Sequence, residues 1–310
     1  MMTEKIRTRI APTPSGYLHV GNLFSFVLTW LIAKWENGIV RLRIDDMDAA
    51  RMRREYLEDI FETLDWIGLQ PDEGPSGIDD FLKNFSQQTR LPLYHNLVNK
   101  LMNTGKVYAC TCSRKQIVAI NPDGMYPGTC LKKNLPTGHE NAALRIHIHE
   151  TETFIDITGF ENYGPTVKVD LQKTMGDFVI RKKDGLPAYQ VTSLADDVHD
   201  KMNLIVRGED LLSSTAAQIF MANSLGENPF SGIHFVHHPL IINENGEKLS
   251  KSAGHSSIKN MREQGISRAE IFNQVANYLK LPQGSYTTLH QLLEAFSNNP
   301  TATHNYLKEK

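Results

Sequence analysis

A stretch rich in proline and glycine, APTPSGYLHVGN at residues 11–22, joins a strand-like segment to a long apolar one. Residues 8–10 predict a short strand, and LFSFVLTWLIAKW at residues 23–35 predicts a buried helix. The stretch between them is then a strand-to-helix loop, which places backbone N–H groups and the positive end of a helix dipole in front of an anion. Gly16 and Gly21 have no side chain, so a ligand can approach the backbone closely there. From this loop alone, an ordinary strand-to-helix turn is an equally good interpretation.

The next segments repeat the order of strand and helix. GIVRLRIDDMD at residues 38–48 alternates as a strand does and ends in an acidic cluster. RREYLEDIFETLDWIGL at residues 53–69 places Leu57, Ile60, Phe61 and Leu64 on one helical face. This alternation is typical of a parallel sheet, whose ligands bind at the carboxyl ends of the strands. The proline and glycine loop and the acidic cluster are therefore expected at one crevice.

Composition limits the class of protein. A length of 310 residues favours two domains or one domain with a large insertion. A net charge of −2 makes a globally basic nucleic-acid binder improbable, although a basic face on part of the surface stays open. The longest apolar run is too short to span a bilayer, and the N-terminus does not have the pattern of a signal peptide. We expect a cytoplasmic enzyme. The odd count of 3 cysteines favours a metal site or free thiols over disulfides.

The middle of the chain has a different character, from about residue 89 to residue 163. A predicted helix at 91–105 leads into VYACTCSRKQIVAINPDGMYPGTC and then into the strand-like ALRIHIHE at 143–150, which we interpret as a small insertion. The strand-like segments GDFVIRKKDGLPAYQVTSLADDV (176–198) and NLIVRGEDLL (203–212) are expected to resume the main sheet. Near the end, SRAEIFNQVANYL predicts a helix that opens with a capping box of Ser267 and Glu270.

Five stretches of the chain, taken together with their order and spacing, carry a family resemblance. RIAPTPSGYLHVGN (9–22) resembles the first signature of the class I aminoacyl-tRNA synthetases, a histidine–glycine loop over the ATP phosphates. EKLSKSAG (247–254) resembles the second signature, a mobile loop that carries lysines. RLRIDDMD (41–48), GDFVIRKKDGLPAY (176–189) and IVRGEDLLSSTAAQ (205–218) resemble the glutamyl branch of that class. The resemblance covers roughly the first 255 residues.

The resemblance implies an α/β fold with a Rossmann-like, doubly wound parallel sheet, an inserted small zinc-containing subdomain and a short helical C-terminal part. The expected parts are residues 1–90 for the first half of the catalytic domain, 91–165 for an inserted acceptor-end and zinc subdomain, 166–255 for the second half with the lysine loop, and 256–310 for a short helical region.

The implied chemistry is the activation of a carboxylate by ATP. The carboxylate attacks the α-phosphate and gives an acyl-adenylate and pyrophosphate, a step that depends on positioning and charge neutralisation. The resemblance makes His19, Lys248 and Lys251 the catalytic residues, with Lys251 favoured for the departing pyrophosphate. It makes His19, Gly21, Asn22 and Lys251 the ATP-binding residues. Without the resemblance, the lysine pair would be interpreted as a solvated basic loop.

The amino-acid pocket is also implied by the resemblance. The glutamate-binding residues are expected to be Arg9, Thr13, Asp45, Tyr189 and Arg207. The arginines would pair with the substrate carboxylates, because a planar guanidinium donates two parallel hydrogen bonds to a carboxylate. Asp45 would accept from the α-ammonium, although the family pattern has glutamate there, and Thr13 stands where the family usually has serine. Alternatively, Arg207 and Asp210 form a structural ion pair and Tyr189 is a packing residue.

The three cysteines form the pattern CTC followed by YPGTC. Thiolates are good zinc ligands, and a C-x-C turn plus a distant cysteine is typical of a zinc site. Family members with this pattern use a tyrosine oxygen as the fourth ligand, so the resemblance implies one structural zinc held by Cys110, Cys112, Tyr126 and Cys130. The alternative is three reduced and partly buried thiols.

The region after the lysine motif, residues 256–310, is short for a domain that reads an anticodon. This resembles the glutamyl-queuosine tRNA(Asp) synthetases, a truncated bacterial branch of the family. Their implied activity is activation of L-glutamate without tRNA, with ATP and Mg²⁺, and transfer to queuosine in the anticodon loop of tRNA(Asp). We expect a monomer with no membrane partner. Two alternatives are a divergent glutamyl-tRNA synthetase that charges a 3′ end, and a non-catalytic paralogue that acts as a binding or regulatory protein.

Overall fold

The computed structural model describes residues 4–160, 163–226, 229–241 and 257–299. The strands within these ranges are β1 (Arg7–Ile10), β2 (Ile39–Leu42), β3 (Val107–Cys110), β4 (Ala143–Ile146), β5 (Phe154–Ile157), β6 (Val167–Asp170), β7 (Phe178–Arg181), β8 (Leu204–Gly208) and β9 (His234–His238). The α-helices are α1 (Val20–Trp35), α2 (Arg54–Trp66), α3 (Ile78–Asp80), α4 (Leu91–Met102), α5 (Arg114–Ile120), α6 (Leu171–Thr174), α7 (Tyr189–His199), α8 (Leu212–Ser224), α9 (Ile258–Glu263), α10 (Arg268–Tyr278) and α11 (Leu289–Asn298).

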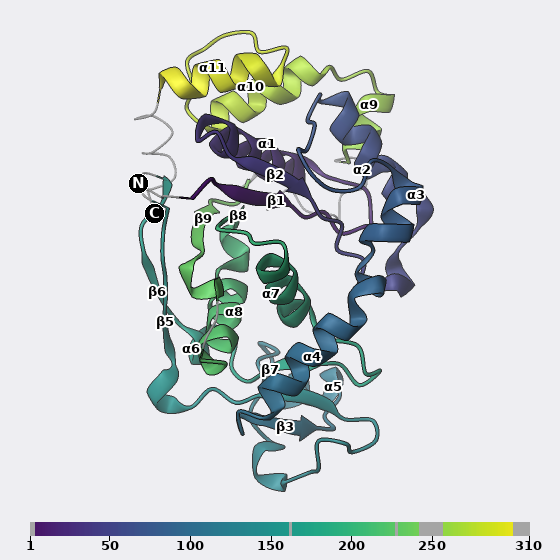
Figure 1. The fold of residues 1–310 in the computed structure, drawn as a ribbon, viewed down its shortest axis with the longest axis vertical. Coiled ribbons are helices and arrows are strands. Elements are labelled where there is room, and N and C mark those ends of the chain that lie inside the picture. Colours follow the sequence, from purple (N-terminus) through teal and green to yellow (C-terminus); the bar gives the residue numbers. More distant parts are fainter. Residues whose placement is uncertain (1–3, 161–162, 227–228, 242–256, 300–310) are drawn as a thin grey trace.

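Two parallel strand pairs form the centre of the molecule (Figure 1). β1 pairs with β2, and β8 pairs with β9, both in parallel. β1 lies next to β8, where the backbone N–H of Asn203 donates to the carbonyl oxygen of Arg7 over 3.1 Å. This arrangement confirms the predicted α/β fold with parallel strands. Because these strands are parallel, the carboxyl ends of β1 and β8 open on one edge of the sheet.

Helix α1 is the central buried helix of the first half. Its apolar residues pack against β1, β2 and β8, and α10 and α11 cover its other side (Figure 1). The predicted capping box of α10 is present: Ser267 accepts from the backbone N–H of Glu270, whose side chain accepts from the backbone N–H of Ser267. Among the described helices, none combines the length and the apolar character needed to cross a membrane.

The inserted region forms a small antiparallel sheet of order β3-β4-β7 at one end of the molecule, with α5 beside it (Figure 1). We predicted that residues 176–198 resume the parallel sheet, and for β7 this is wrong. Phe178 pairs with Ile146 in antiparallel register, so β7 completes the sheet of the insertion. An FVIR strand with alternating burial fits either sheet, and its neighbours in space decide the pairing. The proposed domain boundaries themselves stay predictions.

Candidate functional site

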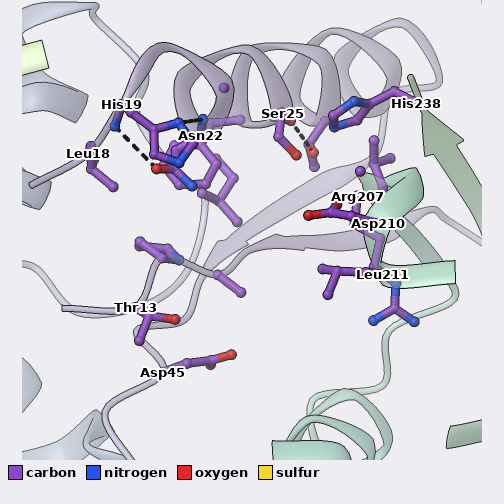
Figure 2. Close-up of a pocket in the computed structure, with 18 of the residues that line it drawn as sticks. Thr13, Leu18, His19, Asn22, Ser25, Asp45, Arg207, Asp210, Leu211 and His238 are labelled. Carbon is purple, nitrogen blue, oxygen red and sulfur yellow. Dashed lines mark hydrogen bonds between the residues drawn. The ribbon is translucent and has the colours of Figure 1, made fainter. Parts of the chain in front are cut away.

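A pocket of about 380 Å³ opens at the carboxyl ends of β1 and β8, beside the N-terminus of α1. All of the predicted ATP-binding and glutamate-binding residues that the structure describes line it: Arg9, Thr13, His19, Gly21, Asn22, Asp45, Tyr189 and Arg207. They come from both halves of the chain, since the last two follow the insertion. Figure 2 shows His19 and Asn22 at the start of α1, with Arg207 and Asp210 of the second half on the other side of the view. The fold therefore brings these distant motifs to one cavity.

His19 is the N-cap residue of α1. Its Nδ1 accepts from the backbone N–H of Asn22 over 3.3 Å, and the Asn22 side-chain oxygen accepts from the backbone N–H of His19 over 3.2 Å (Figure 2). This reciprocal cap satisfies two N–H groups that a helix start leaves open. In a neutral ring whose Nδ1 accepts, the proton is on Nε2. The cap thus orients the ring with a donor at Nε2, at the end of the helix where its dipole favours an anion.

Arg207, in β8, is a buried cation whose hydrogen-bonding capacity is only partly used. Its Nη2 donates to the side-chain oxygen of Gln218 over 2.9 Å, and the side chain is 4% exposed. Within the described residues, its Nε and Nη1 are buried and have no hydrogen-bond partner. Burial lowers the pKa of Arg207 to about 10, although Tyr189 raises it in part. The guanidinium is still charged at neutral pH, and an anionic ligand would stabilise it.

The other two arginines of the pocket are paired with aspartates. Arg43 donates to both oxygens of Asp45 over 2.7 and 3.1 Å, and its Nη1 donates to Asp197 over 2.7 Å. Arg9 donates from Nε to the same oxygen of Asp197 over 2.9 Å. Burial raises the pKa of Asp45, although Arg43 opposes the shift. Asp45 lines the pocket, and the ammonium group of a ligand would share the Asp45 carboxylate with Arg43.

Asp197 is a residue that our sequence analysis did not single out. It is fully buried in α7, and it accepts hydrogen bonds from Arg9 of β1 and from Arg43, which follows β2. Burial raises the pKa of Asp197, but Arg9 and Arg43 outweigh this and lower it overall. The available signal was the DD pair inside the otherwise apolar helix segment SLADDV, because a buried carboxylate needs a cationic partner.

Two predicted catalytic residues cannot be placed. Lys248 and Lys251 lie outside the described residues, within 242–256. The segment that follows them is described, and it contacts the His19 loop directly. Ser257 forms an antiparallel bridge with His19, and the backbone N–H of Ile258 donates to the carbonyl of Leu18 over 2.8 Å. The chain thus returns to the pocket directly after the lysine motif.

The three cysteines meet in the insertion, away from this pocket. The Sγ atoms of Cys110, Cys112 and Cys130 lie within 4.8 Å of one another, and those of Cys112 and Cys130 are 3.5 Å apart. The Tyr126 hydroxyl accepts from the backbone N–H of Cys130 over 2.8 Å, so it lies beside the cluster. Zinc–sulfur bonds of about 2.3 Å in a tetrahedron separate the sulfurs by roughly 3.8 Å. The three sulfurs could therefore hold a metal ion.

A family model matches most of the chain. Residues 5–284 match the model described as "tRNA synthetases class I (E and Q), catalytic domain". A glutamyl-Q tRNA(Asp) synthetase from Prochlorococcus marinus (strain MIT 9313) is 31% identical over an alignment of 313 positions, which covers 99% of this chain and 93% of that protein. A glutamate–tRNA ligase from Anaeromyxobacter sp. (strain Fw109-5) is 34% identical over 89% of this chain, which spans only 57% of that ligase.

Solved structures agree on the fold. The crystal structure of a glutamate–tRNA synthetase from Elizabethkingia anophelis superposes with a TM-score of 0.74 at 23% identity, over 94% of this chain. This chain spans 65% of that synthetase. At this identity the likeness bears on the fold alone.

Proposed function

Because the chain belongs to the class I tRNA synthetases for glutamate and glutamine, we propose that it activates L-glutamate with ATP without needing tRNA. We propose further that it transfers the glutamyl group to the queuosine base of tRNA(Asp). One observation carries the choice of an acidic substrate. Two buried N–H groups of Arg207 have no partner among the described residues, and they belong to the pocket that also holds the capped His19.

Activation is an in-line displacement at phosphorus. A carboxylate oxygen of glutamate bonds to the α-phosphorus of ATP, and the bond from that phosphorus to the bridging oxygen of pyrophosphate breaks. Negative charge grows on the phosphate oxygens, where His19 Nε2–H and the N-terminus of α1 would stabilise it. Lys248 and Lys251 would neutralise the departing pyrophosphate, with Mg²⁺ bound to the phosphates. Here the protein contributes positions and charges, since no covalent intermediate with a side chain is needed.

Glutamate recognition follows from the arginines and Asp45. Carboxylate oxygens of the substrate would accept charge-assisted hydrogen bonds from the unpartnered N–H groups of Arg207, on Nε or on Nη1. Arg9, which is held in place by its hydrogen bond to Asp197, would donate a further hydrogen bond to the substrate. Thr13 and Tyr189 would add hydroxyl contacts, and Asp45 would accept from the α-ammonium. A neutral amide in place of the carboxylate would leave the buried charge of Arg207 uncompensated.

We also assign one structural zinc to the insertion, with Cys110, Cys112, Cys130 and Tyr126 as ligands. The support is the short separation of the three sulfurs and the position of the Tyr126 hydroxyl at their edge. The cluster lies in its own small core with Ile117, apart from the pocket. Bound zinc would stabilise this short insertion and would take no part in the reaction.

The acceptor has two candidates. The match to a glutamyl-Q tRNA(Asp) synthetase over 93% of its length supports queuosine as the acceptor. The match to a glutamate–tRNA ligase at 34% identity supports a second candidate, which is charging of a tRNA 3′ end. The activation step is common to both.

Exchange of labelled pyrophosphate into ATP tests the activation step. With glutamate, the purified protein should support exchange without any tRNA. Glutamine and aspartate should support at least about tenfold less, because glutamine lacks the side-chain charge and aspartate has it on a chain one methylene shorter. Exchange that appears only after tRNA is added would favour the ligase that charges a 3′ end. Absence of exchange with and without tRNA would favour a non-catalytic paralogue.

A further inference from the structure

The imidazole of His238 has a ring nitrogen that the activation step described above does not use. His238 ends β9, is 4% exposed and lines the pocket. Its Nδ1 lies 2.9 Å from the carbonyl oxygen of Pro239. A carbonyl oxygen can only accept, so Nδ1 has the proton and Nε2 is an acceptor in the neutral ring. In the part of the chain that the structure describes, Nε2 is buried and has no hydrogen-bond partner.

The ring is neutral at physiological pH. Burial lowers the pKa of His238 below its usual range, although the Pro239 carbonyl and the carboxylates of Asp210 and Glu209 partly oppose the shift. A buried acceptor without a donor costs free energy, and a ligand that supplies the donor recovers it.

The position of His238 indicates which part of a nucleotide it meets. Its ring packs edge-on against Phe24 with centroids 5.1 Å apart, and its backbone is paired with Gly208 at the end of β8. Phe24 lies five residues after the N-cap His19, which is about 7 Å farther along α1 at a rise of 1.5 Å per residue. In Figure 2, His19 and His238 lie at opposite ends of the view along α1, with Ser25 between them. A nucleotide with its phosphates at His19 would thus extend its base toward His238.

The surroundings of His238 suit a base better than a phosphate. Leu240, Ile241 and Phe26 line the pocket as well, and Ile241 is 5% exposed. Apolar side chains favour contact with the faces of a purine ring, and His238 Nε2 beside them can accept a hydrogen bond from a donor on the edge of the ring. A phosphate would bring several negatively charged oxygen atoms to these apolar side chains and to the carboxylate of Asp210, which also lines the pocket.

We propose that His238 Nε2 accepts a hydrogen bond from the exocyclic amine of adenine and thereby selects ATP. A purine with a carbonyl oxygen at this position, as in guanine or hypoxanthine, would place an acceptor against an acceptor. The inference depends on the proposed function only in taking ATP as the nucleotide. His238 then determines nucleotide specificity and has no part in bond making or breaking.

Equilibrium binding tests this without relying on turnover. Calorimetry would compare ATP with purine riboside triphosphate, in which hydrogen replaces the amine. The wild-type protein should bind ATP about tenfold or more tightly than the analogue, within the range expected for one buried hydrogen bond. His238→Leu should bind both equally, and should bind the analogue about as well as the wild type does. His238→Gln, which keeps an acceptor oxygen, should retain part of the preference. Thermal unfolding of each variant checks that it folds.

Two results would overturn the inference. In one, His238→Leu keeps the preference of the wild type for ATP over the analogue. In the other, His238→Leu abolishes the preference for ATP over 2′-deoxy-ATP instead, which would place Nε2 at the ribose. Failure of pyrophosphate exchange in the wild type would count against the proposed function, while the binding comparison would still report on His238.

Discussion

Buried arginines characterise the pocket at the scale of single residues, and Arg207 differs from the others in its partner. Arg9 and Arg43 each pair with an aspartate, whereas the partner of Arg207 is the neutral side chain of Gln218. A buried cation that lacks a carboxylate partner is costly in the free protein. Such a residue is typical of a site that binds an anion, because the ligand supplies the missing charge.

Arg207→Ala should lower the catalytic efficiency of glutamate-dependent exchange about a hundredfold. Removing one partner of a buried charge pair costs on the order of 3 kcal/mol, which corresponds to that factor. The efficiency is measured by pyrophosphate exchange at varied glutamate concentration. Arg54→Ala is the matched control, since Arg54 is an exposed arginine of α2 whose partner is Glu58. Full glutamate efficiency in Arg207→Ala would refute the role given to this residue.

The sequence allowed prediction of residues that line the pocket but not of the residues that hold their side chains in place. Arg9 and Arg207 were predicted from the family resemblance of the motifs that contain them, and both line the cavity. Asp197 lies 188 positions from Arg9, so its contact with that arginine exists only in the folded chain. His238 was missed for a similar reason, since an unpartnered Nε2 depends on how β9 packs against α1.

At the scale of elements, local patterns predicted several helices and strands, but residues 189–198, which we predicted as strand-like, belong to helix α7. Strand partners were predicted less well. The segment around α1 was predicted as a strand, a loop and a helix, because its apolar run and its Gly and Pro residues are local signals. The histidine cap was not predicted, since Ser, Thr, Asp and Asn are the usual caps. β7 was predicted as a strand but assigned to the wrong sheet, because alternation records burial and does not identify a neighbour.

The zinc assignment also belongs to this scale, since the ligands come from the end of β3 and the loops around it. Metal analysis of protein purified without chelator should find about one zinc per chain, and Cys130→Ser should lose it, because a site needs its full set of thiolates. Lys133→Ala is the control, as an exposed residue close to Cys130 in the sequence. The zinc-free variant should melt at a lower temperature while it keeps most of its exchange activity. Wild-type protein without zinc would indicate three reduced thiols.

At the scale of the whole molecule, the pocket is lined by residues from two halves of the chain. β1 and the start of α1 supply the His19 side, while β8, β9 and α7 supply Arg207, His238 and Tyr189. The Asp197 carboxylate connects the halves, because it accepts from arginines of β1 and of the segment after β2. A substrate bound between them would therefore meet a surface that exists only when both halves have folded together.

The acceptor of the glutamyl group is a property of the complete protein with its tRNA, and labelled glutamate can locate it. If queuosine is the acceptor, tRNA(Asp) that contains queuosine should become labelled, and the same tRNA with its 3′-terminal adenosine removed should be labelled equally well. tRNA(Asp) that has guanosine in place of queuosine should stay unlabelled, because it lacks the accepting group. These three tRNAs separate the two candidates, since a 3′-charging ligase requires the terminal ribose and does not require the modified base. Label that disappears with the 3′-terminal adenosine would therefore assign the chain to 3′ charging, and it would leave the glutamate pocket at Arg207 as proposed.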